Sequence, residues 1–429
     1  MNALLHPASG PTAAPGAGAP DVAAPALALR RIVLSDFRSY RRAELAVPGT
    51  PVVLHGANGA GKTNLLEAIS FLAPGRGLRR ARIVEIERRR AAGEAPGPGW
   101  AVFATLDTPA GERSIGTGRD PAGRGPDRAP EDEASDRRVV RVDGAATKGQ
   151  AALAELVHLL WLTPEMDRIF DGGASERRRF LDRIVLGFVP DHARNLAGYE
   201  QAMRERNRLL KDGHRVARGL DETWLGALEQ TMAENGVAVA AARRQVMGRL
   251  AIAAESAVGP FPAPDLTLAG ETEAELAAGP ALAAEDALRR RLRDSRRADA
   301  EAGRALQGPH RSDLVVHHRA KAMPAALCST GEQKALLVAL VLAAARLLKL
   351  QRGAAPLLLL DEIAAHLDAE RRAALFDEIE ALGAQAWMTG TDARLFESLA
   401  GRAAFFNVAP GSAGEGGTLS AAPQSLESR

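Results

Sequence analysis

The sequence of 429 residues contains one cysteine, Cys328. A single thiol excludes an internal disulfide and a zinc site built from several cysteines. The nine histidines show no paired ligand spacing, which argues against a dedicated transition-metal site. A chain without disulfides suits a reducing compartment, so we expect a cytoplasmic protein.

Long apolar runs are also missing. The longest covers the eleven residues 335–345, whereas a helix needs roughly 20 to cross a bilayer. We therefore expect no membrane partner. The first 26 residues are rich in proline, alanine and glycine and lack a basic segment, which predicts a disordered extension over 1–26 rather than a signal peptide. Glycine, serine and alanine dominate after Ala409, which predicts a disordered tail over 410–429.

Aromatic residues make up only 4% of the chain, and the formal net charge is +2. No global field draws the protein to a polyanion, so any nucleic-acid binding must come from local basic patches. The few aromatics are not interleaved with basic residues, which argues against a base-stacking platform. Only six of the 55 basic residues are lysines. This skew fits a GC-rich coding sequence, and it also fits phosphate recognition by forked guanidinium groups.

One segment matches the complete G-x-x-x-x-G-K-[ST] pattern of a phosphate-binding loop: Gly56, Ala57, Asn58, Gly59, Ala60, Gly61, Lys62 and Thr63. An apolar strand, 52–54, precedes it, and apolar residues at helical spacing follow over 62–73. Backbone N–H groups of such a loop converge on phosphate oxygens. Lys62 is then expected on the β- and γ-phosphates and Thr63 on Mg²⁺. The sequence predicts an ATP site.

Four leucines, 357–360, lead into Asp361 and Glu362. By itself this pattern is an ordinary strand end. Beside a phosphate loop it predicts a Walker B strand, with Asp361 at the metal and Glu362 as the catalytic group that orients or deprotonates water. Lys62 is the second predicted catalytic residue. Asp368 has the spacing of the loop that crosses between paired ATPase heads, and we expect it at the nucleotide.

The run from Ser329 to Lys334 precedes an apolar helix and lies about 27 residues before the Walker B strand. Alone it is a plain capped helix start. At this spacing it resembles the signature motif of ABC-type ATPases. In that superfamily the motif caps the γ-phosphate bound by a second subunit, so the resemblance implies that Ser329 and Gly331 contact ATP in a homodimer.

Family-specific blocks occur in order along the chain. They are 34–40 (LSDFRSY), 163–167 (TPEMD), 172–182 (GGASERRRFLD), 206–211 (RNRLLK) and 308–313 (GPHRSD). Together with the head motifs they resemble the RecF family of recombination mediators, relatives of the structural-maintenance-of-chromosomes (SMC) ATPases. The sequence departs from the family pattern at two places. Thr163-Pro164-Glu165 stands where ABC heads carry the Q-loop glutamine, and Glu332 and Lys334 replace frequent Gln and Arg.

The resemblance implies an ATPase of DNA repair and replication-fork maintenance. Such a protein binds single-stranded, gapped and duplex DNA, hydrolyses ATP weakly under DNA stimulation, and helps load the recombinase at gaps during the SOS response. Its implied partners are DNA, the RecR and RecO mediators, and a second copy of the chain.

The corresponding fold is α/β: an ABC-type head with an antiparallel β subdomain, from residues 27–175 and 300–409, and an inserted helical lobe, 176–299. Candidate strands at 100–106 and 139–142 flank an expected long loop, 108–138. The alternative function is the ATPase subunit of an ABC-type membrane transporter. The 266 residues between Thr63 and Ser329 are more than such a subunit needs. A chromosome-compaction protein requires a long coiled coil, and no heptad pattern is sustained.

Arginines gather in three runs: 76–90, 177–179 and 289–297. Each is either a solvated face or a surface for phosphate backbones. The first run follows directly from the phosphate-loop helix, and its members Arg76, Arg79, Arg80 and Arg82 are the predicted DNA contacts.

Overall fold

The computed structural model describes residues 27–89, 99–119, 138–147, 149–213, 221–255, 259–409 and 418–421. The predicted N-terminal extension, 1–26, and most of the predicted tail lie outside these residues. So do Arg90 and residues 120–137 of the expected loop.

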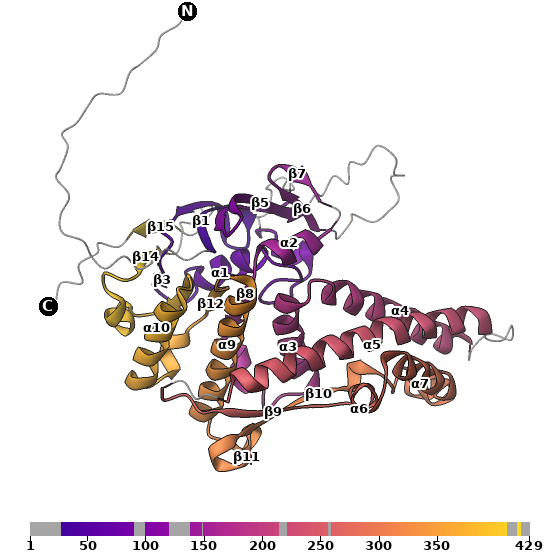
Figure 1. Cartoon of the computed structure of the whole chain (residues 1–429). Helices are drawn as coiled ribbons and strands as arrows, with labels where there is room; N and C mark the ends of the chain where they lie inside the picture. Colours follow the sequence, from indigo (N-terminus) through magenta and orange to yellow (C-terminus); the bar gives the residue numbers. More distant parts are fainter. Residues whose placement is uncertain are drawn as a thin grey trace, which may run out of the picture.

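A mostly parallel sheet forms the centre of the head, with strand order β15-β14-β3-β13-β12-β8. Its strands come from both ends of the chain: β3 (Val52–His55), β8 (Leu159–Leu162), β12 (Leu357–Leu360), β13 (Ala386–Gly390), β14 (Ala404–Ala409) and β15 (Thr418–Ala421). Strand β12 is buried along its whole length because it pairs with β8 and β13 on its two sides. Helices α1 (Lys62–Ser70), α9 (Thr330–Arg352) and α10 (Ala369–Leu382) connect or follow these strands (Figure 1).

The second layer of the head is an antiparallel sheet, β2-β1-β4-β5-β6-β7. Its strands are β1 (Ala28–Phe37), β2 (Tyr40–Ala46), β4 (Ala101–Thr108), β5 (Gly111–Arg119), β6 (Arg138–Val142) and β7 (Ala145–Ala146). The rings of Phe37 and Trp100 meet edge to face, with centroids 5.5 Å apart, and Phe71 after α1 joins them. This aromatic cluster joins the antiparallel sheet to α1.

Two expectations about irregular segments need correction. The expected loop 108–138 contains strand β5, which pairs with β4 through a tight turn at Thr108–Gly111. The expected tail contains β15, because residues 418–421 add to the sheet edge at β14. In both places backbone pairing with a neighbouring strand outweighs a composition rich in glycine and polar residues.

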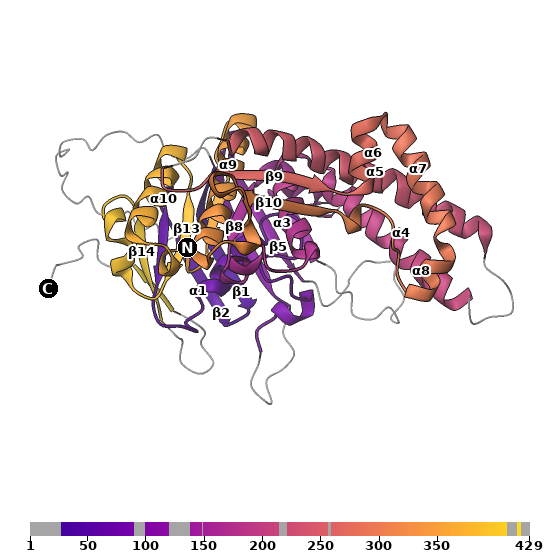
Figure 2. The same cartoon turned by 90° about the horizontal axis from the view of Figure 1, so that it is seen from below.

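The inserted lobe is helical and extends away from the head (Figures 1 and 2). It comprises α3 (Ala174–Phe188), α4 (His192–Gly213), α5 (Glu222–Ala253), α6 (Glu271–Ala278), α7 (Ala281–Asp294) and α8 (Arg296–Ala302). A small sheet of β9 (Pro264–Ala269), β10 (Asp313–His318) and β11 (Met323–Pro324) runs alongside. Residues of α3, α5 and α9 share one buried apolar cluster, so lobe and head have a continuous core.

Candidate nucleotide site

The glycine loop, 56–63, connects β3 to α1. Gly56 has φ +142°, and a Cβ there would lie 2.2 Å from the carbonyl oxygen of Val408. Gly61 has φ +111°, and its Cβ would lie 2.7 Å from Oη of Tyr40. Both positions therefore require glycine, for backbone conformation and for space. The loop is held in place by β14 and β2 behind it.

Lys62 is the first residue of α1 and is almost fully buried. Its Nζ donates to the carbonyl oxygens of Gly56 (2.7 Å) and Ala57 (2.9 Å). Burial lowers the pKa of Lys62, while Glu362 and Asp361 nearby raise it. The ammonium group lies across the glycine loop, where a bound anion would meet it.

Three oxygen-bearing side chains meet beside this lysine. Thr63 Oγ1 donates to the carboxylate of Asp361 at 3.0 Å. Thr389 Oγ1, from the end of β13, donates to Asp361 Oδ1 at 2.7 Å. The structure thus brings Thr63 and Asp361, separated by 298 residues, into contact. Hydroxyl and carboxylate oxygens are ligands that suit Mg²⁺, which completes its shell with water and phosphate oxygens.

Glu362 follows Asp361 at the end of β12. Its backbone N–H donates to Thr389 Oγ1 at 2.8 Å, and its φ is +51°. A non-glycine residue in the left-handed region costs on the order of 1–3 kcal/mol, and such strain clusters at functional sites. Thr389 holds both acidic residues of the Walker B segment in position. The sequence analysis did not predict the role of Thr389. The pattern that indicates it is an apolar strand after the Walker B strand that ends in a hydroxyl-bearing residue.

Ser329 and Gly331 begin helix α9. Ser329 Oγ accepts from the N–H of Glu332 (3.4 Å), and the Glu332 carboxylate accepts from the N–H of Ser329 (3.1 Å), forming a capping box. Lys321 pairs with Glu332. This ion pair, together with the Ser329 N–H, lowers the pKa of Glu332 to about 2. An added Cβ on Gly331 would meet nothing within 4 Å, so this helix start is open to a ligand.

The helix start and the glycine loop of one chain do not meet. Strand β11, which shortly precedes Ser329, lies at the bottom of Figure 1, whereas α1 lies in the upper part. The structure therefore does not bring the signature residues together with Lys62 within one chain.

The start of α9 contacts the segment after β8, which the resemblance places at the position of the Q-loop. Lys334 Nζ lies 3.2 Å from Asp167 Oδ2 and is almost fully buried. Gln333 Nε2 donates to Asp171 Oδ1 at 3.1 Å. Lys334 stands where the family often has arginine, and it places a cation beside Asp167.

Asp368 is the N-cap of α10. Its Oδ1 accepts from the N–H of Arg371 at 2.8 Å. Within its own chain Asp368 therefore serves as a helix cap, and its predicted contact with nucleotide remains a prediction.

The four arginines predicted to bind DNA differ in their contacts. Arg79 donates to Asn64 Oδ1 (2.7 Å) and Glu67 Oε2 (3.2 Å) of α1. Arg76, Arg80 and Arg82 are exposed. None of these three forms an ion pair with another residue of the described ranges. The loop after α1 therefore carries unpaired positive charge next to the phosphate-loop helix.

Several arginines of the other two runs are occupied within the fold, although Arg290, Arg293 and Arg297 of the third run are exposed. Arg177 makes a bidentate pair with Asp313 (2.8 and 2.9 Å), and Arg178 donates to the carbonyl of Ser312. In the third run, Arg291 pairs with Glu275 and Arg296 with Glu229. Arg177 and Arg178 link α3 to residues 312–313, and Arg291 and Arg296 link segments of the lobe. These contacts leave fewer of the arginines for a ligand.

Three of the family-specific blocks, 172–182, 206–211 and 308–313, contribute to a buried polar network. Arg206 is fully buried between Glu229 (3.1 Å) and Asp299 (2.7 Å). Oη of Tyr199 lies 2.6 Å from Nδ1 of His310. Arg243 donates to the carbonyl of Pro309 and pairs with Asp182. This network ties the helices of the lobe to the segment that returns to the head.

No helix within the described ranges has both the length and the hydropathy of a membrane span.

Residues 31–90 match the family model described as an AAA domain. The chain is 52% identical to DNA replication and repair protein RecF of Brucella suis biovar 1 (strain 1330), over 90% of this chain and 95% of that protein. It is 50% identical to the protein of the same name from Mesorhizobium japonicum, over 90% and 97%.

Solved structures show the same fold. The chain matches the recombination mediator protein RecF-ATPrS in the RecFOR pathway with a TM-score of 0.74 at 22% identity, over 89% of this chain and 96% of that one. The match to RecF-ATP has a TM-score of 0.71. An SMC head from Pyrococcus furiosus matches at 0.50 with 16% identity. The predicted fold, an ABC-type head with an inserted helical lobe, is confirmed.

Proposed function

The chain belongs to the RecF family of DNA replication and repair proteins, and from this premise we propose that it is an ATP-dependent DNA-binding protein whose heads dimerise around ATP. The observation that carries the proposal is the cluster of Lys62, Thr63, Asp361 and Thr389. It joins a phosphate loop to a carboxylate from the other end of the chain. Family membership argues against the transporter alternative.

Each side chain of the site has a role that its position supports. Lys62 binds the β- and γ-phosphates, and the glycine loop supplies backbone N–H groups. Thr63 and Asp361 would hold Mg²⁺, which neutralises phosphate charge. Glu362 accepts the proton of the attacking water. Thr389 is a positioning residue because it bonds to Asp361 and to the backbone of Glu362.

Dimerisation follows from the separation of the two half-sites. The space beside Gly331 is open, and strand β11, which shortly precedes Ser329, lies apart from α1 in Figure 1. A helix N-terminus attracts anions through its free N–H groups. We therefore place Ser329 and Gly331 of one copy against the γ-phosphate held by Lys62 of a second copy, with Asp368 at the same interface.

Mixing two inactive variants tests this arrangement. Ser329→Arg blocks the signature, and Lys62→Ala removes the phosphate cation. Each alone should lose ATPase activity. A mixture contains dimers in which Lys62 of the first variant faces the intact signature of the second, so part of the activity should return. No recovery from mixed dimers whose presence is demonstrated would reject action across the dimer.

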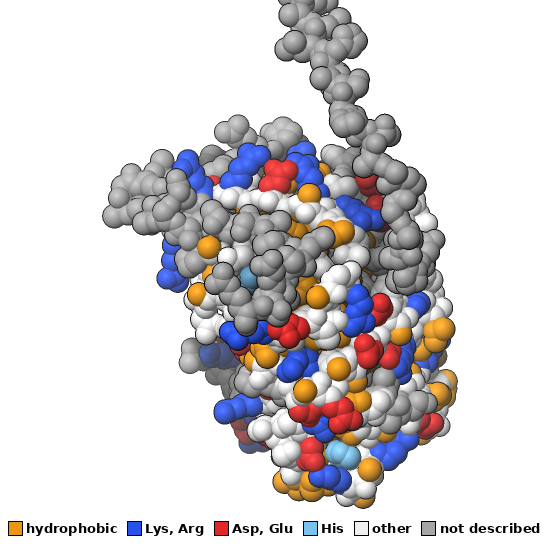
Figure 3. Space-filling view, turned by 90° about the vertical axis from the view of Figure 1, so that its left-hand side faces the viewer, with side chains coloured by type: hydrophobic (Ala, Val, Ile, Leu, Met, Phe, Trp, Pro, Cys, Tyr) orange, Lys and Arg blue, Asp and Glu red, His pale blue; other side chains and the backbone are white. Residues whose placement is uncertain are grey.

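DNA contact is proposed for the loop after α1. Arg76, Arg80 and Arg82 have no carboxylate partner in the described residues, and Arg79 connects the loop to Glu67 of α1. The face at the left side of Figure 1, by contrast, shows basic and acidic side chains interspersed (Figure 3). A local, unpaired group of arginines is what binding to a phosphate backbone needs.

The remaining functions implied by the family are part of the same proposal. They are binding of single-stranded, gapped and duplex DNA, loading of the recombinase at gaps with RecO and RecR, and action in the cytoplasm. The domain limits 27–175 with 300–409 for the head and 176–299 for the lobe are also proposed. Crosslinking RecR and RecO to the chain on gapped DNA, with and without ATP, tests the partners.

A further inference from the structure

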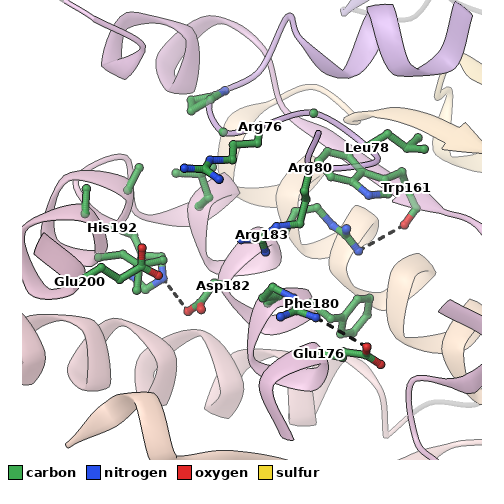
Figure 4. A pocket seen from close by; sticks show the side chains of 18 of the residues that line it. Arg76, Leu78, Arg80, Trp161, Glu176, Phe180, Asp182, Arg183, His192 and Glu200 are labelled. Atoms are coloured by element: carbon green, nitrogen blue, oxygen red, sulfur yellow. Dashed lines mark hydrogen bonds and ion pairs between the residues drawn. The ribbon is translucent and has the colours of Figure 1, made fainter. Parts of the chain in front are cut away.

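A cavity of about 570 Å³ lies between the loop after α1 and the first two helices of the lobe (Figure 4). Its walls come from residues 74–80, from the segment after β8, and from α3 and α4. No residue of the glycine loop lines it, so the cavity is separate from the nucleotide site.

Arginines dominate the charge of this cavity. Its lining includes five arginines and four carboxylates: Arg76, Arg80, Arg179, Arg183, Arg204, Glu165, Glu176, Asp182 and Glu200. Three of the carboxylates already have cationic partners. Glu176 pairs with Arg179, Glu200 with Arg204, and Asp182 with Arg243. Three arginines of the lining remain outside these ion pairs: Arg76, Arg80 and Arg183. Glu165 is the one carboxylate of the lining outside these pairs, so the cavity has an excess of positive charge.

Arg183, on the wall of this cavity, packs against two aromatic rings. Its guanidinium lies over the rings of Trp161 (4.2 Å) and Phe180 (5.4 Å), and one nitrogen donates to the carbonyl of Trp161 at 3.4 Å. Its Nε is buried and has no hydrogen-bond partner. Among the described residues no carboxylate pairs with it. Burial, and then the charge of Arg80, lower its pKa to about 9.

Arg183 as a whole is partly buried, and a cation partly withdrawn from water without a counterion loses hydration, so proteins normally pair such groups. Arg206 and Arg243 of the same lobe, both buried, are paired with carboxylates, so the lobe supplies counterions for these two arginines. Arg80 adds a second signal, because its backbone has φ +55°. Its left-handed conformation stores strain of the kind that accompanies functional sites.

We propose that this cavity binds a phosphate group, held by Arg183 and Arg80 with Arg76 at the entrance. Within the described residues, Nη2 of Arg183 meets only the carbonyl oxygen of Trp161 and Sδ of Met166. A phosphate would give this guanidinium the counterion that it lacks, and forked donors suit phosphate oxygens. The group comes from a DNA backbone or from a free phosphate compound. The proposed phosphate site does not depend on the proposed function. Only the assignment of the phosphate to a DNA backbone depends on that function.

Thermal unfolding of the full chain in phosphate and in chloride of equal ionic strength tests the site. Two proteins are compared: the Lys62→Ala variant and the Lys62→Ala/Arg183→Met double variant. Both carry Lys62→Ala because this substitution suppresses phosphate binding at the glycine loop. Phosphate should raise the Tm of the Lys62→Ala chain by about 2 °C or more. It should leave the Tm of Lys62→Ala/Arg183→Met unchanged. Equal shifts in the two proteins, or no shift in either, would overturn the proposal.

A second readout separates a ligand-binding arginine from a structural one. In chloride, Arg183→Met should raise Tm, because methionine fills the same space against Trp161 without an unpaired charge. A fall in Tm would mark Arg183 as a structural residue and count against the site. Arg80→Gln, at an exposed position, should lose the phosphate shift while the protein stays folded. Arg297→Met, a matched control on α8 that is 90% exposed, should keep the shift.

Equilibrium dialysis with labelled inorganic phosphate then identifies the source. Displacement of the label by duplex DNA assigns the cavity to the DNA backbone. Displacement by a mononucleotide but not by DNA assigns it to a free phosphate compound. Absence of bound label in the Lys62→Ala chain would reject the site. If duplex DNA fails to bind the chain at all, the proposed function fails while phosphate binding remains measurable.

Discussion

The nucleotide site and the arginine network of the lobe both consist of charged side chains brought together from distant parts of the chain, yet they differ in how these charges are satisfied. In the lobe, Arg206, Arg243 and Arg296 each meet carboxylates. At the nucleotide site, Lys62 donates to backbone carbonyls of the glycine loop, and Glu362 is held in a strained conformation. The first pattern stabilises a fold, and the second leaves groups available for a ligand.

The same contrast separates the three arginine runs. Arg177 and Arg296 look like Arg80 in the sequence, each within a basic run. The structure pairs the first two with Asp313 and Glu229, from remote segments. Arg80 forms no ion pair with a carboxylate of the described residues, although Glu200 and Asp182 lie close enough to act on its charge. A basic run therefore reports a binding surface only where the fold supplies no counterion. Five predictions test this distinction.

The largest effect is expected for Lys62→Ala. The variant should lose ATP binding and hydrolysis because no other cation lies in the glycine loop, while its thermal stability without nucleotide stays near that of the parent. Lys62→Arg should retain more binding than hydrolysis, since a planar fork replaces a point charge. Equilibrium binding of labelled ATP measures the first effect. Normal ATPase activity of Lys62→Ala would contradict the assignment of the loop.

Glu362→Gln should slow hydrolysis by about 10²–10⁴-fold, because the amide cannot accept a proton from water. ATP binding should persist, and the ATP-bound dimer should accumulate. Single-turnover hydrolysis and analytical sedimentation measure the two effects. A Thr389→Val variant should show a smaller loss of rate through misplacement of Glu362. Only monomers of Glu362→Gln in saturating ATP would count against dimerisation.

Arg206→Ala should destabilise the protein by about 3–5 kcal/mol, because it leaves Glu229 and Asp299 buried without their shared cation. Arg208, two residues later in the same block, is the matched control: its side chain is 84% exposed and lies 3.6 Å from Asp212. Arg208→Ala should change stability by less than about 0.5 kcal/mol. Denaturant unfolding checks both. Equal effects would break the distinction between paired and solvated arginines.

Replacing Arg76, Arg80 and Arg82 with alanine should weaken DNA binding about equally for unrelated sequences. The log–log salt slope should become shallower by about 0.9 for each lost phosphate contact. The control, which removes the same charge elsewhere, replaces the exposed Arg290, Arg293 and Arg297. Fluorescence anisotropy over a salt series measures both proteins. Identical slopes for the two triple variants would show that the loop after α1 has no special role.

The most gradual effect, spread over several pH units, concerns His158 in the head. Burial, and then the charge of Arg352, lower its pKa to about 4. Below about pH 6.5 the unfolded chain binds a proton that the folded protein takes up only near pH 4. Stability should therefore fall as pH decreases across this window, by at most about 1.4 kcal/mol per pH unit. Urea unfolding of His158→Gln should show a weaker pH dependence, and an unchanged one would exclude this histidine as the cause.

Much of the architecture could be predicted because its signals are local. The glycine loop is eight consecutive residues, and the Walker B strand is an apolar run followed by two acids. Thr389 escaped prediction because its role depends on β13 lying beside β12. Strands β5 and β15 also escaped, since their pairing partners, not their composition, make them strands.

The sequence by itself determined the family, the ABC-type fold and the identity of the phosphate loop, since backbone conformation and anion binding there depend on residues adjacent in the chain. Only the tertiary structure decided which charges are paired. Arg183 faces Trp161 and Arg80, while Arg243 faces Asp182, although neither arginine differs from the other as a residue type. Whether a charge is compensated depends on the side chains that folding places within a few ångströms of it, and most of these come from remote positions.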